Sequence, residues 1–390
     1  MPGFELVGQE ERDAVNQVFD DGGILFAHGF DAMRKGRFRV REFERAFAER
    51  MGVRYAQAVN SGTAALKVGL VAMNVKPGDE VITQAFTFVA TVEAIVDVGA
   101  IPVLANSDKT LNMDPVELER VITPRTKAIL PVHMLGVAAE MDAIMAVARK
   151  HGVFVLEDNC ESIGATWNGK MLGTQGDVGA FSFDCGKTIT TGESGMITTN
   201  DESIFKLARE YHDHGHESNP AFPRGRDTRR IHGFNYRMTE LQAAVGLAQL
   251  PKLDRIVSRN REVYAIFAQS LKDIEGLVLR HIPPQCEPLS DCLIFELPSI
   301  ELAQKFVQRL AEAKLGTKNL PDAFEWHFAG YWDHIFDRFG INKDMLWHQT
   351  LPSYNHLARC VSLPIMVKYS DERAQEIGAK VRQIAEEVLQ

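Results

Sequence analysis

The sequence predicts an α/β fold, with a large domain built on a mostly parallel sheet and a smaller α+β domain after it. Between residues 53 and 200, short apolar runs alternate with helical patterns, as strands and helices do in a parallel α/β sheet. A chain of 390 residues is also long enough to form two hydrophobic cores. Beyond residue 250 the alternation becomes irregular. We therefore expect a large domain of residues 1–250 and a small domain of residues 251–390.

Seven strands are expected in the large domain. They cover residues 53–59, 80–85, 101–106, 126–133, 153–158, 178–184 and 195–200. Helices are expected before and between them, over residues 38–51, 61–75, 88–99 and 141–152, and Asp114 followed by Pro115 opens a further one. Proline directly after an N-cap aspartate favours the first helical turn. With helices on both faces of such a sheet, ligands bind at the carboxyl ends of the strands.

The rest of the chain is expected to carry a long loop, then helices and a strand. Residues 213–235 are polar and rich in arginine, and a loop that long in a compact domain usually has a function or lies at an interface. Helices are expected over residues 239–250, 253–271, 299–313 and 370–390, and a strand over residues 291–298. Pro251 ends the first of these helices, and Ser370 is the expected N-cap of the last.

Composition limits the classes of function. The formal net charge of −9 argues against nucleic acid as the main partner. The five cysteines are odd in number and include no CxxC pair, which indicates reduced thiols. The chain begins without the basic and apolar regions of a signal peptide, and no apolar run approaches the length of a membrane span. A cytoplasmic protein without membrane insertion is therefore expected.

Lys187 is the strongest candidate for a catalytic residue. It follows a short apolar strand and Gly186, and it begins a loop rich in threonine and glycine. Asp158 ends the strand expected over residues 153–158. A lysine and an aspartate at the ends of neighbouring strands fit a pyridoxal phosphate site, where the lysine forms a Schiff base and the aspartate pairs with the pyridinium nitrogen. An opposite charge beside that nitrogen raises its pKa.

Further residues could complete such a site. Gly62 and Thr63 lie between a strand and a helix, where backbone N–H groups and a hydroxyl suit a phosphate, and Ser182 adds a second hydroxyl. Phe88 lies at the next strand–helix junction, where it could stack on the pyridine ring. Taken singly, these residues also fit a helix cap or the core, and Lys187 fits an exposed surface. Their joint arrangement favours the cofactor site.

Five runs of sequence resemble the DegT/StrS family of sugar aminotransferases, which have pyridoxal phosphate fold type I. They are SGTAAL (61–66), TFVAT (87–91), EDNCESIGA (157–165), FSFDCGKTITTGESG (181–195) and GFNYRMTELQAAVGLAQL (233–250). The resemblance implies a homodimer with active sites at the subunit interface. It also implies ping-pong transfer of an amino group, usually from L-glutamate, to a keto- or aldehydo-sugar. Asn235 would then reach the phosphate of the neighbouring subunit's cofactor, with Arg237 as the alternative.

Two positions depart from the pattern that this resemblance implies. Glu161 stands where the family often has glutamine, next to the cofactor's 3′-oxygen. A carboxylate that faces a phenolate is repelled unless it is protonated or turned away, so Glu161 is expected at the site in a role that the sequence leaves open. The common GEGG is here GESG, and the side chain of Ser194 is expected to reshape the pocket where backbone approaches the ligand.

Other interpretations compete with an aminotransferase. Sugar dehydratases that resemble this chain replace the lysine, typically with histidine, so Lys187 favours amino transfer. The run CGKT (185–188) resembles the end of a phosphate-binding loop, but Phe181 stands where that motif needs glycine. A non-catalytic sensor is less expected, because no helix-turn-helix motif or basic arm is evident.

A histidine cluster suggests a metal site. His212, His214 and His216 would share one face of a strand, but they follow an expected helix and Gly215 indicates its end. We therefore expect no metal, and we favour a substrate contact of His214 near the interface.

The acceptor is the least constrained part of the prediction. Residues 316–334 and the run EDNCESIGA are similar to family members that form 8-amino-3,8-dideoxy-manno-octulosonate. That similarity implies 8-oxo-3,8-dideoxy-manno-octulosonate as the preferred acceptor, in lipopolysaccharide sugar biosynthesis, with a nucleotide-linked keto-deoxyhexose as the alternative. Arg237, His214 and His327 are the expected substrate contacts. The arginines of residues 224–230 suit a carboxylate or plain solvation equally well.

Overall fold

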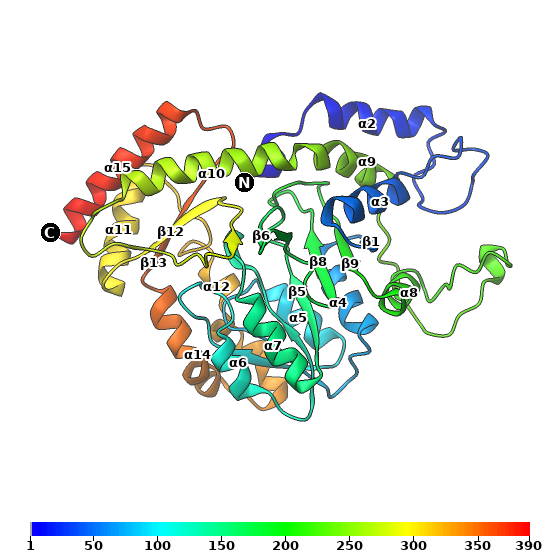
Figure 1. The fold of residues 1–390 in the computed structure, drawn as a ribbon, viewed down its shortest axis with the longest axis horizontal. Helices are drawn as coiled ribbons and strands as arrows, with labels where there is room; N and C mark the ends of the chain where they lie inside the picture. Colours follow the sequence, from blue (N-terminus) through cyan, green and yellow to red (C-terminus); the bar gives the residue numbers. More distant parts are fainter. Residues whose placement is uncertain (1) are drawn as a thin grey trace.

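The computed structural model describes residues 2–390 and contains a seven-stranded central sheet (Figure 1). Its strand order is β1-β9-β8-β5-β4-β2-β3. The strands are β1 (Tyr55–Val59), β2 (Glu80–Gln84), β3 (Ile101–Ala105), β4 (Thr126–Leu130), β5 (Phe154–Asp158), β8 (Val178–Ser182) and β9 (Gly195–Thr199). In this sheet β9 is antiparallel to both of its neighbours, and the other pairs are parallel. The predicted α/β class with a mostly parallel sheet is confirmed.

Helices cover both faces of this sheet, as the alternating pattern predicts (Figure 1). They are α3 (Arg39–Met51), α4 (Gly62–Ala72), α5 (Val89–Asp97), α6 (Pro115–Val121), α7 (Met141–His151) and α8 (Glu202–Tyr211). One apolar core includes Phe43 from α3 and Ile144 from α7, and another includes Leu66 from α4 and Ile95 from α5. Asp114 caps α6 as predicted. The two cores bury both faces of the sheet, which explains why its strands are apolar along their whole length.

A second, smaller sheet has the order β10-β12-β13. Its strands are β10 (Val278–Leu279), β12 (Cys292–Glu296) and β13 (Cys360–Pro364), and α10 (Leu253–Ser270), α11 (Ile300–Glu312) and α15 (Asp371–Leu389) pack around it. A third sheet joins β11 (Cys286–Glu287) to β6 (Thr166–Trp167) and β7 (Lys170–Met171). That sheet connects chain from before and after residue 250, so the domain boundary at that residue stays a prediction.

One segment of the C-terminal part returns to the large sheet. It contains α12 (Phe324–His327), η4 (Ala329–Tyr331), α13 (Asp333–Phe336), η5 (Asp337–Phe339) and α14 (Lys343–Leu357). Phe328 is fully buried and forms an isolated bridge with Phe86, just beyond the carboxyl end of β2. Thr87 N donates a hydrogen bond to His327 O at 2.9 Å. We call residues 317–357 the returning segment, because they form a wall beside that end of the sheet.

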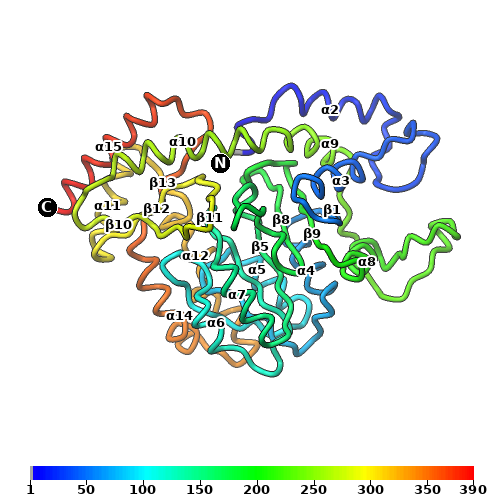
Figure 2. The backbone as a smooth tube through the Cα atoms, viewed as in Figure 1, coloured from blue at the N-terminus to red at the C-terminus, as the bar shows by residue number. Residues whose placement is uncertain are grey.

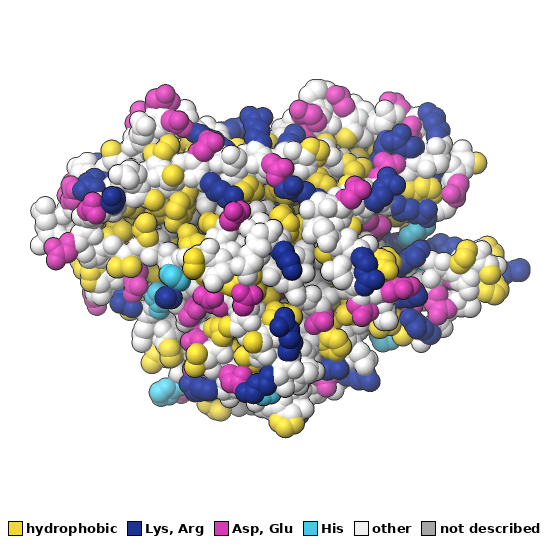
Figure 3. Space-filling view, viewed as in Figure 1, with side chains coloured by type: hydrophobic (Ala, Val, Ile, Leu, Met, Phe, Trp, Pro, Cys, Tyr) yellow, Lys and Arg dark blue, Asp and Glu magenta, His cyan; other side chains and the backbone are white. Residues whose placement is uncertain are grey.

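Two loops extend from the same side of the large sheet (Figure 2). They are residues 21–38, which follow α2 (Gln9–Asp20), and residues 213–235, which include η2 (Arg224–Arg226) and precede α9 (Glu240–Gln249) and η3 (Leu250–Lys252). The loops touch each other, since His28 Nε2 lies 3.2 Å from Asp213 Oδ2 and the Arg224 guanidinium lies 5.7 Å from the centre of the Phe26 ring. The face drawn in Figure 3 mixes acidic and basic side chains. Within residues 2–390 no helix is long and apolar enough to cross a membrane.

Candidate active site

One cavity of about 490 Å³ opens at the carboxyl ends of the central strands. Its volume lies in the range of small-molecule sites. The lining includes Gly62, Thr63, Phe88, Thr91, Asp158, Glu161, Ser182, Asp184, Lys187, Asp291, Lys318, Asn319 and His327. Every residue predicted to touch the cofactor within one chain therefore lies in one place.

Asp158 is fixed at the end of β5, with its side chain almost fully buried. Its Oδ2 accepts a hydrogen bond from Thr91 Oγ1 at 2.8 Å, and its Oδ1 accepts one from Cys160 N at 3.1 Å. The Thr91 hydroxyl also lies 2.7 Å from Thr87 Oγ1. Because each carboxylate oxygen has its own donor, the carboxylate keeps one orientation at the edge of the cavity.

Glu157, the other member of the acidic pair, serves the fold instead. Successive strand residues point to opposite faces, so Glu157 is turned away from the cavity. Its carboxylate is fully buried, lies 3.0 Å from His133 Nε2 and accepts hydrogen bonds of 2.6–2.8 Å from the N–H groups of Gly173, Gln175 and Gly176. Burial raises the pKa of Glu157, but His133 and these N–H groups outweigh it and the pKa is lowered.

Lys187 extends into the cavity from the loop after β8. Its Nζ lies 3.7 Å from Glu161 Oε1 and 3.8 Å from Asp184 Oδ2. Burial lowers the pKa of Lys187, but these two carboxylates outweigh it, so the pKa is raised and the amine is protonated. The backbone of the loop is held from behind by α1 (Pro2–Glu5), where Gly3 N donates to Lys187 O at 3.0 Å.

The turn before α4 forms a small polar cradle. Ser61 caps the helix, since its Oγ accepts a hydrogen bond from Ala64 N at 3.0 Å. Among the described residues, the N–H groups of Gly62 and Thr63 find no acceptor, and they lie at the positive end of the helix. A Cβ atom on Gly62 would lie 2.7 Å from Ser182 Cβ, so only glycine lets the serine approach. Two N–H groups and a hydroxyl therefore converge on a space suited to a phosphate.

Phe88 and His327 form the aromatic side of the cavity. Phe88 is 43% exposed, so it is not a core residue, and its ring centre lies 5.3 Å from that of His327. His327 Nδ1 lies 2.7 Å from Ala323 O, and Nε2 lies 3.0 Å from Asn319 Nδ2. A carbonyl oxygen can only accept, so Nδ1 carries the proton and Nε2 accepts from the Asn319 amide.

Glu161 is an ionised carboxylate that faces cations. Its Oε2 accepts a hydrogen bond from Leu135 N, in η1 (Met134–Gly136), at 3.3 Å. Burial raises the pKa of Glu161, but Lys187, His327 and, more weakly, Lys318 lower it, so the pKa ends below its usual value. The charge left open by the sequence is therefore negative, and two amines compensate it.

Ser194 does not line the cavity, so the expectation that its side chain reshapes the pocket is wrong. The residue is fully buried, and its hydroxyl lies 2.5 Å from Thr191 Oγ1. The close approach falls one residue later. A Cβ atom on Gly195 would lie 2.3 Å from Ser61 O, so this position requires glycine while position 194 has room for serine.

Three predicted residues lie outside the cavity of their own chain: His214, Asn235 and Arg237. His214 and Asn235 are exposed. Arg237 Nη1 donates to Asp213 Oδ1 at 2.6 Å, and Arg224 binds the same carboxylate through both of its terminal nitrogens, at 2.5 and 2.6 Å. These arginines are therefore engaged within the chain. The roles of the three residues toward a second copy stay predictions.

The side chains of the three neighbouring histidines do not converge on one point. His212 is buried with Nδ1 2.6 Å from Arg209 O, and burial lowers its pKa to about 4. His216 Nδ1 lies 3.3 Å from Asp227 Oδ2, whereas His214 is exposed. In the described part of the chain, no three His, Cys, Asp or Glu residues are grouped as a metal site would need.

Five of these lining residues were missed by sequence reasoning: Thr91, Asp184, Asp291, Lys318 and Asn319. Thr91 lies in the run TFVAT, and Asp184 lies three residues before Lys187, so proximity along the chain could have indicated both. Lys318 and Asn319 carry no comparable signal, because they reach the cavity only when the returning segment folds back onto the sheet.

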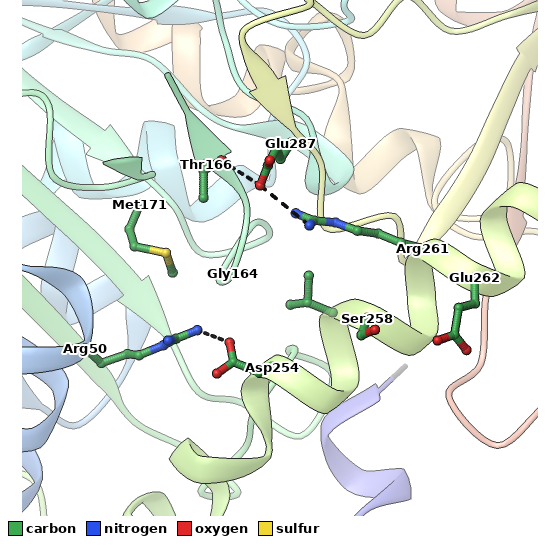
Figure 4. Close-up of a pocket in the computed structure, with 10 residues that line it drawn as sticks. Arg50, Gly164, Thr166, Met171, Asp254, Ser258, Arg261, Glu262 and Glu287 are labelled. Carbon is green, nitrogen blue, oxygen red and sulfur yellow. Dashed lines mark hydrogen bonds and ion pairs between the residues drawn. The ribbon is translucent and has the colours of Figure 1, made fainter. Parts of the chain in front are cut away.

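A second cavity, of about 500 Å³, lies between α10 and the third sheet (Figure 4). Its charged side chains bind one another. Arg50 pairs with Asp254, and Arg261 Nη1 lies 3.6 Å from Glu287 Oε2. No lysine lines this cavity, so it offers no counterpart of Lys187.

Comparison with known proteins identifies the family. The sequence pattern of the DegT/DnrJ/EryC1/StrS aminotransferase family matches residues 27–382. The chain belongs to this family. It is 48% identical over 273 residues to GDP-perosamine synthase of Caulobacter vibrioides, covering 69% of each chain. It is 41% identical to the spore coat polysaccharide biosynthesis protein SpsC of Bacillus subtilis, covering 97% of this chain and 95% of that protein.

Solved structures agree with this assignment. The aminotransferase from Psychrobacter cryohalolentis superposes with a TM-score of 0.86 at 27% identity, covering 98% of each chain. For 3-amino-5-hydroxybenzoic acid synthase the TM-score is 0.84 at 29% identity, covering 99% of this chain and 98% of that one. The resemblance to the DegT family is confirmed, and so is fold type I. The protein is a pyridoxal phosphate-dependent sugar aminotransferase.

The cavity fits the cofactor that DegT aminotransferases use. Pyridoxal phosphate needs an amine at its aldehyde carbon, an acid at its ring nitrogen and donors at its phosphate. Lys187 and Asp158 supply the amine and the acid, and the cradle at Gly62 supplies donors that lack partners in the chain. When bound, this cofactor carries the amino group and takes up the electrons released when a C–H bond next to that group breaks.

Proposed function

We propose that this aminotransferase moves the amino group of L-glutamate to a nucleotide-linked keto-sugar in a ping-pong reaction. The observation that carries the reaction type is the shared cavity of Lys187 and the fixed Asp158 carboxylate. The nucleotide-linked acceptor is supported by the C. vibrioides relative, whose name refers to a GDP-linked amino sugar.

In this proposal Lys187 binds the cofactor's aldehyde carbon and, when free, carries the proton taken from the substrate. The carboxylates of Glu161 and Asp184 are close enough to favour its protonated form. Asp158 keeps positive charge on the ring nitrogen, because a fixed negative charge at that atom stabilises the protonated form. Thr91 holds Asp158 in that orientation.

The remaining residues position the cofactor and the substrate. Gly62, Thr63 and Ser182 would hold the phosphate, and the exposed ring of Phe88 would stack on the pyridine. His327 lies beside Phe88 and would contact the substrate.

We further propose a homodimer in which each copy completes the other's site. The two extended loops support this, because they present exposed apolar side chains, among them Phe30 and Phe222. Asn235 would reach the phosphate bound by the partner copy, and Arg237 and His214 would lie near its substrate. Five free cysteines also support a reducing, cytoplasmic setting.

The free acid 8-oxo-3,8-dideoxy-manno-octulosonate, with a role in lipopolysaccharide sugar biosynthesis, stays a prediction. The relatives reported above are named for GDP-perosamine and for spore coat polysaccharide, so they favour the nucleotide-linked alternative. Because the two acceptors differ in charge and size, one direct assay distinguishes them.

The test compares both acceptors with L-glutamate as donor. Glutamate alone should change the absorbance of the cofactor on the purified protein. Adding a GDP-linked 4-keto-6-deoxyhexose should then restore the first spectrum and yield an amino sugar in stoichiometric amount with 2-oxoglutarate. Restoration by 8-oxo-octulosonate alone would overturn the nucleotide-linked proposal. A colourless protein after incubation with pyridoxal phosphate would contradict the site itself.

A further inference from the structure

The wall of the cavity that faces Lys187 and Glu161 contains a second lysine, Lys318. Its backbone N–H donates to Ser362 O, in β13, at 2.9 Å. Its Nζ forms an ion pair with Asp291, which stands directly before β12 and accepts a hydrogen bond from Ile365 N through its own carbonyl at 3.0 Å. Both members of the pair are therefore anchored to the smaller sheet, while both line the cavity.

Lys318 keeps unused donors in a nearly buried position. Its side chain is 12% exposed and that of Asp291 is 8% exposed. Burial lowers the pKa of Lys318, but Asp291 and Glu161 outweigh it, so the pKa is raised and the ammonium keeps three N–H donors. Among the described residues, Asp291 is the one hydrogen-bond partner that the structure gives it. A buried donor without a partner is costly, so a bound substrate oxygen would be favoured there.

The charges of the cavity decide which kind of oxygen fits. Next to Lys318 stand two carboxylates, Asp291 and Glu161. The lining as a whole carries five carboxylate side chains, Asp158, Glu161, Asp184, Glu193 and Asp291, against two lysines, Lys187 and Lys318. A further carboxylate beside Lys318 would be repelled by its neighbours. A hydroxyl would not, and it could also donate to an acid.

Asn319 and His327 extend the same wall. The Asn319 amide lies 3.0 Å from His327 Nε2, so this histidine nitrogen already has a partner within the wall. Lys318 is therefore the charged donor of this wall with hydrogen-bonding capacity to spare.

We propose that Lys318, held by Asp291, recognises a hydroxyl group of the acceptor sugar and so determines acceptor specificity. This inference rests on the sugar aminotransferase activity and adds a recognition site to it. L-Glutamate has no hydroxyl, so Lys318 serves the second half of the ping-pong cycle and not the first.

The test measures the two half-reactions separately in the holoenzyme. In Lys318→Met, the rate of the single-turnover half-reaction with L-glutamate should change by less than about 3-fold. The kcat/KM of the half-reaction with the acceptor sugar should fall about 10- to 100-fold. Lys318→Arg should recover part of this loss. Lys305→Met, which removes an exposed lysine of α11, is the matched control and should leave both rates unchanged.

The Lys318→Met variant leaves the buried carboxylate of Asp291 without its cation, which could disturb folding. The double variant Asp291→Asn, Lys318→Met removes that unpaired charge and so controls for a folding defect. It should melt near the wild-type temperature and keep the selective loss. An equal loss in both half-reactions of this variant would overturn the proposal. So would an unchanged sugar half-reaction.

Acceptor analogues that lack one hydroxyl at a time identify the group. With the wild-type enzyme, one analogue should react about 10- to 100-fold more slowly than the complete sugar. With the Lys318→Met enzyme, that analogue and the complete sugar should react at equal rates. A loss of the same size in both enzymes for every analogue would refute recognition by Lys318. The acceptor in these assays is whichever of the two tested sugars the wild type aminates. If the proposed acceptor is wrong, the wild-type assay shows it. If the role proposed for Lys318 is wrong, only the rates of the Lys318→Met variant show it.

Discussion

The two walls of the cavity differ in how they are built. The cofactor wall comprises Gly62, Asp158, Ser182 and Lys187, which stand at strand ends and in the turns that follow them. The acceptor wall comprises Asp291, Lys318, Asn319 and His327, which come from irregular chain near the smaller sheet and from the short α12. The first wall is fixed by the ladder of the large sheet. The second depends on contacts between distant segments, such as the bridge from Phe86 to Phe328.

This difference suggests a division of labour. The chemistry of amino transfer is the same for every acceptor, so its groups gain from a rigid sheet edge. Acceptors vary, and irregular segments can change without disturbing the sheet. If this division holds, substitutions in the cofactor wall should reduce the rates of both half-reactions. Substitutions of neighbouring residues that do not face the cavity should leave those rates unchanged.

The largest effect is expected for Lys187→Ala. Both half-reactions should slow by more than about 1,000-fold, because the variant lacks the amine that binds the cofactor and carries the proton. Absorbance spectra after incubation with pyridoxal phosphate should lack the band of the lysine-bound cofactor. A variant that kept this band would show that another amine of the cavity, such as Lys318, attaches the cofactor.

Asp158→Asn should rank second. The amide keeps the shape of the carboxylate but removes the charge at the ring nitrogen, so kcat should fall about 100- to 1,000-fold in both half-reactions. Thr91→Val is the matched control, since it removes one hydrogen bond to Asp158 and keeps its charge. It should cost about 10-fold or less. Equal losses in the two variants would mean that orientation, and not charge, is what Asp158 provides.

Glu157→Gln should affect stability and spare the chemistry. Losing the charge that faces His133 and three N–H groups should lower the free energy of unfolding by about 1.5–3 kcal/mol, with kcat/KM within about 3-fold of wild type. The folded-state pKa of Glu157 is lowered, so its stabilising contribution is complete above the ordinary value of 4.5 and is lost as pH falls below it. Denaturant titrations between pH 3 and 7 should show that this part of the acid sensitivity is missing in the variant. A large loss of activity at neutral pH would contradict the separation of Glu157 from the cavity.

The smallest effect is expected for Ser194→Gly. The serine hydroxyl bonds to Thr191 and does not reach the cavity, so kcat/KM should change by less than about 2-fold in either half-reaction. Melting temperature should fall slightly, because one buried hydrogen bond is lost. A change in acceptor preference in this variant would restore the expectation that Ser194 shapes the pocket.

The sequence was informative about the cofactor wall for a physical reason. Apolar runs of six to eight residues predicted the central strands, and parallel strands bring their carboxyl ends to one edge. Asp158 and Lys187 could therefore be expected to meet although 29 residues separate them. The alternation of strand side chains also explains why Asp158 and not Glu157 faces the cavity, although the sequence presents the two as a pair.

Charge pairing was beyond the reach of local patterns. The arginines of residues 224–237 suited a carboxylate or plain solvation equally well, but Arg224 and Arg237 bind Asp213. The role of Glu161 was left open, and the neighbouring Lys187, His327 and Lys318 lower its pKa. In each case the partner lies in another element, and nothing in the spacing of either residue indicates the other.

By itself the sequence determined the α/β class and the family, and it indicated the residues that we propose for the chemistry of amino transfer, because these follow from strand ends and from runs of adjacent residues. Only the tertiary structure decided the charge of Glu161, the outward turn of Ser194 from the cavity and the presence of Lys318 beside Asp291. Ser194 is held by Thr191 in its own loop. The charge of Glu161 and the position of Lys318 depend on the returning segment and the smaller sheet reaching the edge of the large sheet, and such long-range packing leaves no periodic trace in the chain.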